Sequence, residues 1–286
     1  MHDHRFHPGA TRARPLRPVR AAWEYLVFYF ALLYFGVGGV LYSCLCAVLY
    51  LLLPRPAGIR FGRSMSGFLF RTYLGVLRST GLLRVDLRSL DALRAEPGLV
   101  IAPNHPSLLD AVLVISRIPQ VGCIMKASVW DNPVLGGGAR LSGHIRNTSP
   151  RGMVRGAAQE LRAGHSLLVF PEGTRTRGGT VNRFRGGFAL IAKHARAPVQ
   201  TVFIETNSAF LGKGWPLLKK PALPLQYRAR LGRRFVVSGD VQAFVAGLEG
   251  YFREELSGTS SSAATRACDH ITAVGSRDRS HVRNAG

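Results

Sequence analysis

Acidic residues are scarce in this sequence. It has 16 Asp and Glu residues against 38 Lys and Arg residues, which gives a formal net charge of +22. Residues 1–20 carry +4 of this charge and residues 257–286 carry +2, so the remaining +16 lies in the body of the chain. A body this basic excludes cationic partners and favours anionic ones: lipid headgroups, nucleic acid or an acidic carrier protein.

Cysteines are also few, and their placement excludes a disulfide framework. Cys44 and Cys46 lie in one apolar run, whereas Cys123 and Cys268 stand alone. Small domains that depend on disulfides carry many more cysteines, set at regular spacings. We therefore expect a reducing compartment.

The sequence has little that suggests a bound metal or nucleotide. The run Gly136–Gly138 lacks the Lys-Ser/Thr pair of a phosphate-binding loop, so it predicts a flexible turn. Three histidines near the amino terminus either bind a metal or belong to an unanchored tail: His2, His4 and His7. We expect no metal and no bound cofactor.

Formal charge is absent from Tyr25 to Leu53, a run of 29 residues. This run exceeds the roughly 20 residues that cross a bilayer and predicts a membrane anchor. The anchor is either one tilted helix or a pair of short helices that break at Gly36, Gly38 and Gly39. Five arginines precede the run and five follow within 25 residues. That symmetry fits a re-entrant anchor with both ends on the cytoplasmic face, and also a single span.

A second amphipathic stretch follows, over about residues 59–80. It mixes aromatic and leucine side chains with Arg60, Arg63, Arg71 and Arg78. This composition is typical of a helix at the lipid interface. A helix that covers the core of the following domain is an equally good interpretation.

From residue 98 the pattern alternates between strands and helices. Short apolar runs predict buried strands at Leu99–Ala102, Val121–Lys126, Ser166–Phe170 and Val199–Ile204. Amphipathic stretches predict helices at Leu108–Arg117, Arg151–Ala163 and Phe184–Ala195. This order predicts an α/β fold, with a mixed, largely parallel sheet flanked by helices behind an N-terminal membrane-anchoring helical segment. Residues 226–238 predict a late hairpin that turns at Gly232.

Four segments follow from these patterns. Residues 1–22 form a basic tail, residues 23–80 the membrane anchor and interfacial helices, residues 81–256 the catalytic domain, and residues 257–286 a disordered tail. Within the catalytic domain, Lys213, Lys219 and Lys220 mark a basic loop that either borders the entrance for a substrate or is simply solvated.

Two polar blocks lie at the ends of apolar runs. The first reads Asn-His-Pro-Ser-Leu-Leu-Asp over residues 104–110, and the second reads Phe-Pro-Glu-Gly-Thr-Arg-Thr-Arg over residues 170–177. His105 and Asp110 would lie about 140° apart on one continuous helix, so they meet only if the chain folds back in a strand-to-helix turn. An imidazole oriented by a carboxylate can take a proton from an alcohol, although such a pair also fits a structural histidine.

The two blocks together resemble the lysophosphatidic acid acyltransferase superfamily of glycerolipid acyltransferases. Asn104, His105 and Asp110 match its Asn-His-x4-Asp block, and the second block matches its Phe-Pro-Glu-Gly-Thr-Arg-Ser-Arg block except at Thr176. The resemblance covers about residues 60–235.

The resemblance implies a membrane-bound enzyme that transfers a fatty acyl group from acyl-CoA or acyl-carrier protein to a lysophospholipid hydroxyl. His105 is then the general base and Asp110 orients its ring, while backbone N–H groups stabilise the oxyanion. The implied acceptor is 1-acylglycerol-3-phosphate, and the implied location is a bacterial inner membrane with the catalytic domain on the cytoplasmic side. The candidate substrate-binding residues are Asn104, Arg146, Asn147, Glu172, Gly173, Thr174 and Arg175.

The sequence departs from the family at two places. Asn147 stands where the family has a phosphate-binding Arg, and Arg146 comes one residue early. The stretch from Ala197 to Thr201 lacks the second proline of the family's fourth block. These differences leave open another acceptor, such as lyso-ornithine lipid or a specialised lipid-pathway product. From the charge alone, a membrane-tethered basic protein that binds nucleic acid remains an alternative, although we expect no nucleic-acid partner.

Overall fold

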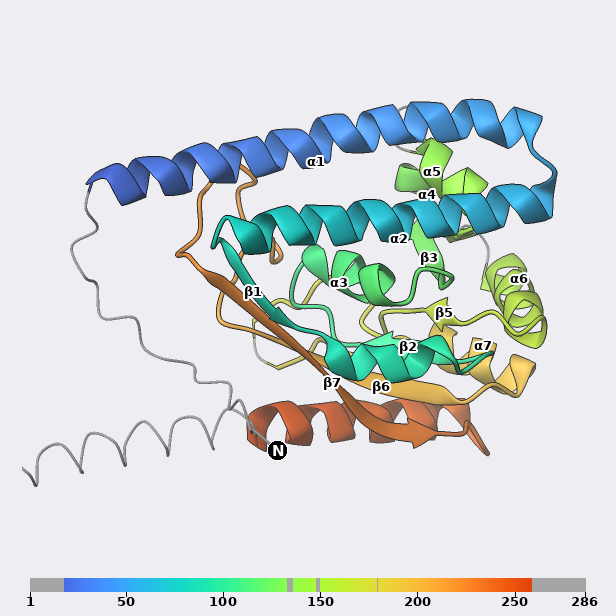
Figure 1. The fold of residues 1–286 in the computed structure, drawn as a ribbon. Coiled ribbons are helices and arrows are strands. Elements are labelled where there is room, and N and C mark those ends of the chain that lie inside the picture. Colours follow the sequence, from blue (N-terminus) through green and yellow to red (C-terminus); the bar gives the residue numbers. More distant parts are fainter. Residues whose placement is uncertain (1–17, 133–135, 148–149, 179, 259–286) are drawn as a thin grey trace, which may run out of the picture.

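The computed structural model describes residues 18–132, 136–147, 150–178 and 180–258. The predicted metal-binding or unanchored histidines, most of the basic tail and nearly all of the C-terminal tail lie outside these residues. Two long helices open the described chain, α1 at Pro18–Leu52 and α2 at Arg55–Ser79. They run antiparallel to one another along one side of the molecule (Figure 1).

The apolar run predicted as an anchor lies within one continuous helix. The prediction of a pair of short helices is wrong, because α1 passes through Gly36, Gly38 and Gly39 without a break. The chain turns only at Leu53 and Pro54, where a proline suits the first residues of a new helix. Among the described residues, α1 is the one helix that is both long enough and apolar enough to span a membrane. Only 11% of its most apolar 18-residue window is buried.

The helix α2 covers the core of the following domain. Tyr73, Leu74 and Leu77 are buried in the same core as the apolar side chains of α3 at Leu109–Arg117. Arg60, Arg71 and Arg78 face solvent as expected for an interfacial helix. Arg63 does not, because it is buried and pairs with Glu160 at 2.8 Å.

Among the described residues, a seven-stranded sheet has the order β1-β7-β6-β2-β5-β3-β4. The strands are β1 Leu83–Asp86, β2 Val100–Pro103, β3 Gly122–Lys126, β4 Ile145–Asn147, β5 Leu167–Leu168, β6 Val199–Thr206 and β7 Leu225–Phe235. All neighbouring strands are parallel except β6 and β7, so the predicted mixed, largely parallel sheet is confirmed.

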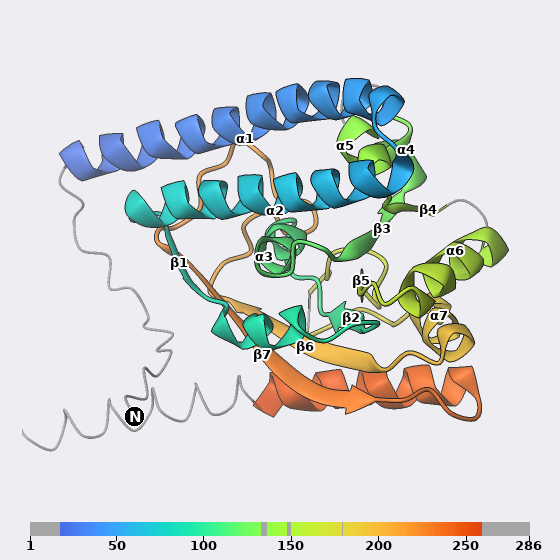
Figure 2. The same cartoon turned by 45° about the vertical axis from the view of Figure 1, so that its right-hand side comes forward.

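Helices cover both faces of the sheet. On one face lie α1, α2, α3 and the 3₁₀ helix at Arg88–Arg94, and on the other lie α6 at Pro150–Arg162, α7 at Gly187–Ala195 and a helix over 241–258 (Figures 1 and 2). Alternate side chains of β2 enter the two cores, with Ile101 in the first and Val100 in the second. Each apolar run predicted as a strand or helix in this domain therefore contains an element of the expected type.

The hairpin predicted at residues 226–238 is wrong. Residues 225–235 form the single strand β7, and Gly232 lies at a β-bulge opposite Thr201. A Cβ at Gly232 would come within 2.4 Å of Phe203, so the glycine serves a close approach between strands and not a turn.

The flexible turn predicted at Gly136–Gly138 is also wrong. These glycines begin the short helix α5 at Gly136–Leu141, which follows α4 at Ala127–Trp130. A Cβ at Gly137 would lie 2.0 Å from the backbone oxygen of Ser43, so the glycine lets α5 pack directly against α1. The hydroxyl of Ser43 accepts a hydrogen bond from Gly137 N–H at 2.9 Å.

Candidate active site

The first polar block begins where β2 ends, next to β6. The side-chain N–H of Asn104 donates to the carbonyl oxygen of Ile204 at 2.9 Å, and Ile204 N–H donates back to Asn104 Oδ1 at 2.7 Å. This paired contact is buried and holds the chain immediately before His105. The amide of Asn104 is thus engaged by the sheet.

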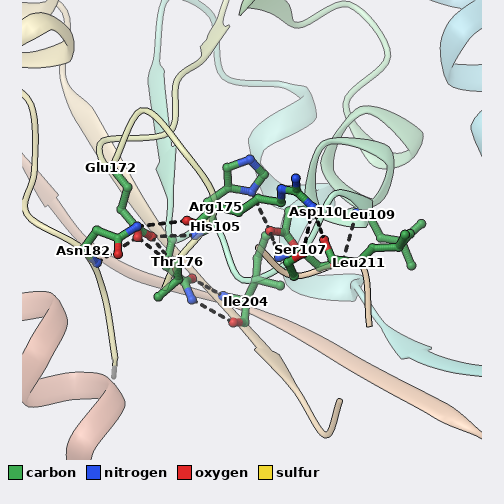
Figure 3. A network of polar contacts seen from close by, with 12 residues as sticks. His105, Ser107, Leu109, Asp110, Glu172, Arg175, Thr176, Asn182, Ile204 and Leu211 are labelled. Atoms are coloured by element: carbon green, nitrogen blue, oxygen red, sulfur yellow. Dashed lines mark hydrogen bonds and ion pairs between the residues drawn. The ribbon is translucent and has the colours of Figure 1, made fainter. Parts of the chain in front are cut away.

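The chain then folds back as the spacing requires. His105 Nδ1 lies 2.8 Å from Asp110 Oδ2 (Figure 3). The helix α3 begins only at Leu109, and Asp110 in its first turn accepts the backbone N–H of Ser107 at 2.8 Å. The side-chain hydroxyl of Ser107 accepts a hydrogen bond from Leu109 N–H at 3.2 Å. These local capping interactions bring the carboxylate to the imidazole.

The carboxyl group of Asp110 is fully buried. Burial raises its pKa to about 6, and the charge of Glu172 acts in the same direction. Hydrogen bonding and charge from His105, with the Ser107 N–H, oppose this rise. In the described part of the chain, Asp110 Oδ1 has no hydrogen-bond partner, so the histidine stands beside a desolvated carboxyl group.

The imidazole of His105 is held on its face and at one nitrogen. Its ring stacks on Phe170 with 3.8 Å between ring centroids, which joins the first block to the second. With Nδ1 directed at Asp110, the tautomer that donates to the carboxylate leaves Nε2 as a base. The side chain is 14% exposed, so a substrate hydroxyl can approach it.

Glu172 in the second block is enclosed by donors from three places in the chain. Its oxygens accept the backbone N–H of His105 at 2.9 Å, the backbone N–H of Asn182 at 2.8 Å, and the hydroxyl of Thr176 at 2.9 Å. Only 1% of Glu172 is exposed. Figure 3 shows its carboxylate linking His105 to Thr176 and Asn182.

Asn182 is a residue that the sequence patterns did not single out. Its Nδ2 donates to the carbonyl oxygen of Arg175 at 3.0 Å, and its Oδ1 accepts Arg177 N–H at 3.0 Å. The side chain therefore braces the turn of the second block. An asparagine five residues after the block was the only signal, and asparagines in loops are too common to identify it.

The remaining residues of the second block shape this turn. Gly173 has φ +66°, and a Cβ there would lie 2.8 Å from Arg185 Cδ, so the position needs glycine. Arg175 donates from one guanidinium nitrogen to the carbonyl oxygens of Leu211 and Gly212, both at 2.8 Å. Thr174 accepts a hydrogen bond from Lys213 at 3.2 Å.

Arg146 and Asn147 lie apart from this cluster, on the edge strand β4. Three strand spacings separate β4 from β2, which is about 14 Å in the direction of the hydrogen bonds. Arg146 forms an ion pair with Asp131, and Asn147 is in register with Lys126 on β3. The structure therefore groups residues 172–175 of the second block with Asn104, His105 and Asp110 of the first. Arg146 and Asn147 lie outside that group.

The arrangement can move a proton without a metal ligand set. Among the residues described, no group of three or more His, Cys, Asp or Glu side chains is placed to hold a metal ion. An accessible imidazole nitrogen backed by a buried carboxyl can accept a proton from an alcohol and return it to a leaving group.

Residues 84–205 match the family described as Acyltransferase. Over this segment, which is less than half of the chain, the protein is similar to that family. The match contains both polar blocks, together with β2, β5 and most of β6.

The curated proteins that this chain is similar to include two kinds of lipid acyltransferase. The 1-acyl-sn-glycerol-3-phosphate acyltransferase of Limnanthes douglasii is 26% identical over 193 residues, covering 63% of this chain and 65% of that protein. The lyso-ornithine lipid O-acyltransferase of Pseudomonas aeruginosa is 35% identical over 114 residues, covering 38% of this chain and 43% of that protein. The matched regions thus span less than two thirds of these relatives.

A solved structure has the same fold. The crystal structure of the 1-acyl-sn-glycerophosphate acyltransferase PlsC from Thermotoga maritima matches with a TM-score of 0.58 and 18% identity. The match covers 86% of this chain and 98% of that one. At this identity the likeness shows the fold alone, a sheet with flanking helices.

Proposed function

We propose that this protein is a membrane-bound acyltransferase and moves a fatty acyl group from acyl-CoA or acyl-carrier protein to the free hydroxyl of 1-acylglycerol-3-phosphate, giving phosphatidic acid. The contact between His105 Nδ1 and the buried Asp110 is the observation that carries this proposal. It orients the ring so that Nε2 serves as the base for an acceptor alcohol.

The reaction proceeds through one addition and one elimination. His105 Nε2 takes the hydroxyl proton as the acceptor oxygen forms a bond to the thioester carbonyl carbon. The resulting oxyanion is stabilised by backbone N–H groups, and the carbon–sulfur bond breaks when it collapses. The imidazolium then returns its proton to the thiolate. The products are the ester and the free thiol, and His105 is again a neutral base.

Residues around the dyad have mainly positional roles in this proposal. Asn104 fixes the end of β2 through Ile204, and Glu172 fixes the backbone of His105. Gly173 and Thr174 shape the turn that faces the acceptor, and Arg175 holds the carbonyl oxygens of Leu211 and Gly212. Arg146 and Asn147 are proposed to act at the periphery of the site.

The membrane attachment is proposed to be an in-plane one. Val27 and Phe28 of α1 belong to the domain core, and Cys46 further along α1 is also buried. About 28 Å of helix separates these contacts, so a helix perpendicular to the bilayer would carry the domain into the hydrocarbon. The outer face of α1 instead presents large apolar side chains to lipid, including Trp23, Leu26, Phe30, Leu33, Leu41 and Leu45.

Charge supports the same orientation. Arg60, Arg71 and Arg78 are exposed on α2 beside α1, where they can contact anionic headgroups while α1 contacts acyl chains. We therefore propose residues 23–80 as the membrane-binding region and residues 81–256 as the catalytic domain. We propose a bacterial inner membrane as the location, with this domain on the cytoplasmic side, where acyl-CoA and acyl-carrier protein are found.

A second acceptor has specific support. The Pseudomonas aeruginosa relative is named for lyso-ornithine lipid, and Asn147 stands where the resembled superfamily has an arginine. Transfer to lyso-ornithine lipid is therefore the alternative function, with the same base and the same donors.

An acceptor panel tests the proposal. The purified protein in mild detergent is given labelled palmitoyl-CoA, or acyl-carrier protein loaded with the same chain, together with lysophosphatidic acid, other lysophospholipids or lyso-ornithine lipid. We expect labelled phosphatidic acid from the wild type and none from His105→Ala. Labelling of lyso-ornithine lipid alone would replace the proposed acceptor, and no transfer from either donor would contradict acyl transfer to these lipids.

A further inference from the structure

The loop between β6 and β7, residues 207–224, is held by both polar blocks. Ser107 Oγ donates to the carbonyl oxygen of Phe210 at 3.0 Å, and Leu108 N–H donates to that of Leu211 at 3.1 Å. From the second block, Arg175 donates to the carbonyl oxygens of Leu211 and Gly212. The base of this loop is therefore fixed against the active site from two sides.

The backbone at this point is strained. Leu211 has φ +55°, a left-handed conformation that disfavours residues with a side chain by about 1–2 kcal/mol. Three hydrogen bonds to Leu211 and Gly212 hold this conformation in place. Backbone strain that its surroundings over-determine is concentrated at functional sites, and Lys213 lies two residues after Leu211.

The far end of the loop meets the proposed membrane helix. Lys220 pairs with Glu24 of α1 at 3.0 Å, and Tyr29 donates to the carbonyl oxygen of Leu218 at 3.3 Å. Leu217 and Leu218 are 59% and 67% exposed. Figures 1 and 2 show this orange loop rising from the sheet to α1. The loop thus spans from the apolar outer surface to the active site.

The side chain of Lys213 contacts the second polar block. Its amine donates to Thr174 Oγ1 at 3.2 Å, one residue before Arg175. The charge of Arg177 is the largest influence on the pKa of Lys213, and it lowers that pKa, as do the charges of Lys126 and Arg175. Arg177, Lys126 and Arg175 are all cations, and a cluster of cations favours binding of an anion.

We infer that Lys213, with Arg177 and Lys126 beside it, binds the phosphate headgroup of the lipid acceptor. The inference rests on the proposed function and names a residue that determines its acceptor. It also gives a physical account of Asn147, whose neighbour in register is Lys126. Arg146 is held by Asp131, so a cation from the β6–β7 loop supplies the charge that the β4 position lacks.

The chemistry of the site selects a phosphate monoester. At neutral pH such a group carries about −1.5 to −2 charges and three acceptor oxygens, which several cations can share. An ornithine headgroup carries one carboxylate and one ammonium, so it has no net negative charge for these cations to attract. The phosphates of CoA have related chemistry, so the experiment must separate the acceptor from the donor.

Binding without donor tests the role of Lys213 independently of turnover. Isothermal titration in detergent compares 1-acylglycerol-3-phosphate with 1-acylglycerol, which lacks the phosphate. We expect Lys213→Glu to weaken binding of the phosphate lipid about 10-fold or more and to leave 1-acylglycerol unchanged. Lys219→Glu, in the same loop and with the same change of charge, should leave both affinities within about two-fold. Equal affinities of wild type and Lys213→Glu for the phosphate lipid would overturn the inference.

Steady-state transfer distinguishes the two sources of phosphate. The KM for 1-acylglycerol-3-phosphate should rise in Lys213→Glu, with kcat and the KM for acyl-CoA unchanged. A rise only in the KM for acyl-CoA would overturn the inference by assigning the cation to the donor. If the wild type bound the phosphate lipid through Lys213 but transferred nothing to it, the headgroup site would stand and the proposed reaction would fail.

Discussion

The two polar blocks differ in how their side chains are used. In the first block, His105 is partly exposed, and Asp110 keeps one buried oxygen without a partner among the described residues. In the second block, both oxygens of Glu172 are hydrogen-bonded, and Arg175 donates to two backbone carbonyl oxygens. The first block thus has the groups available for chemistry, whereas the second holds them in position.

The comparison separates two kinds of charged side chain that look alike in a sequence. Asp110 and Glu172 are both buried carboxyl groups within the same site. Burial without full hydrogen bonding raises the pKa of Asp110, whereas Glu172 has donors from His105, Thr176 and Asn182. Replacing Asp110 by its amide should therefore raise the free energy of unfolding, whereas replacing Glu172 by its amide should lower it.

The largest expected effect on activity is that of His105→Ala. Removing the general base should lower kcat by about 10² to 10⁴-fold. The side chain is 14% exposed, and Glu172 holds only the backbone N–H of His105, so the melting temperature should change little. Transfer assays and thermal unfolding on the same preparation measure both. A variant that keeps wild-type turnover would remove the first block from the chemistry.

Asp110→Asn should lower activity and raise stability. The amide favours the wrong imidazole tautomer, so we expect kcat to fall by at least about 10²-fold. The pKa of Asp110 is raised from 3.8 to about 6 in the folded protein, so wild-type stability falls as pH rises through this interval. At pH 8 the variant should gain at most about 3 kcal/mol over the wild type.

Unfolding at two pH values checks the sign of this effect. At pH 4 the carboxyl is largely protonated in the folded state, so the gain from Asp110→Asn should nearly vanish. A variant that is less stable than the wild type at pH 8 would show that the carboxylate is better stabilised than its burial indicates.

Glu172→Gln should act mainly on stability. All groups that face its oxygens are donors, so the new amide would place an N–H against a backbone N–H or hydroxyl. We expect a loss of about 3 kcal/mol in the free energy of unfolding, and a fall in kcat because the backbone of His105 is released. Denaturant titration measures the free energy of unfolding. Unchanged stability with lost activity would make Glu172 a substrate ligand.

The smallest expected effect is that of Arg175→Ala. Loss of the contacts to Leu211 and Gly212 should loosen the β6–β7 loop and reduce kcat/KM about 10-fold for lysolipids with and without a phosphate monoester alike. The two acceptors are compared in parallel assays. A loss confined to the phosphate acceptor would instead assign Arg175 a direct contact with the headgroup.

Much of the fold was predictable because apolar runs report burial directly. The strands ending at Pro103 and Leu168 and the helix beginning at Leu109 all lie where such runs predict them. Gly232 was misread because a glycine that permits a close strand approach looks the same in a sequence as one in a turn. Gly137 was misread for the same reason, since its partner is a backbone atom of α1.

The site was predictable in its residues more than in their roles. The spacing of His105 and Asp110 required the fold-back that the structure has. The partners of Glu172 and Arg175 are largely backbone groups, which leave no trace in the identity of the residues that supply them. Long-range contacts of this kind, including those of the β6–β7 loop, appear only once the chain is folded.

The most direct test measures transfer activity and unfolding together for His105→Ala and Glu172→Gln. The account predicts that His105→Ala loses turnover at a near wild-type melting temperature, whereas Glu172→Gln unfolds at a clearly lower temperature. The opposite pattern, with His105→Ala unstable and Glu172→Gln stable but inactive, would contradict the assignment of chemistry to the first block and support to the second.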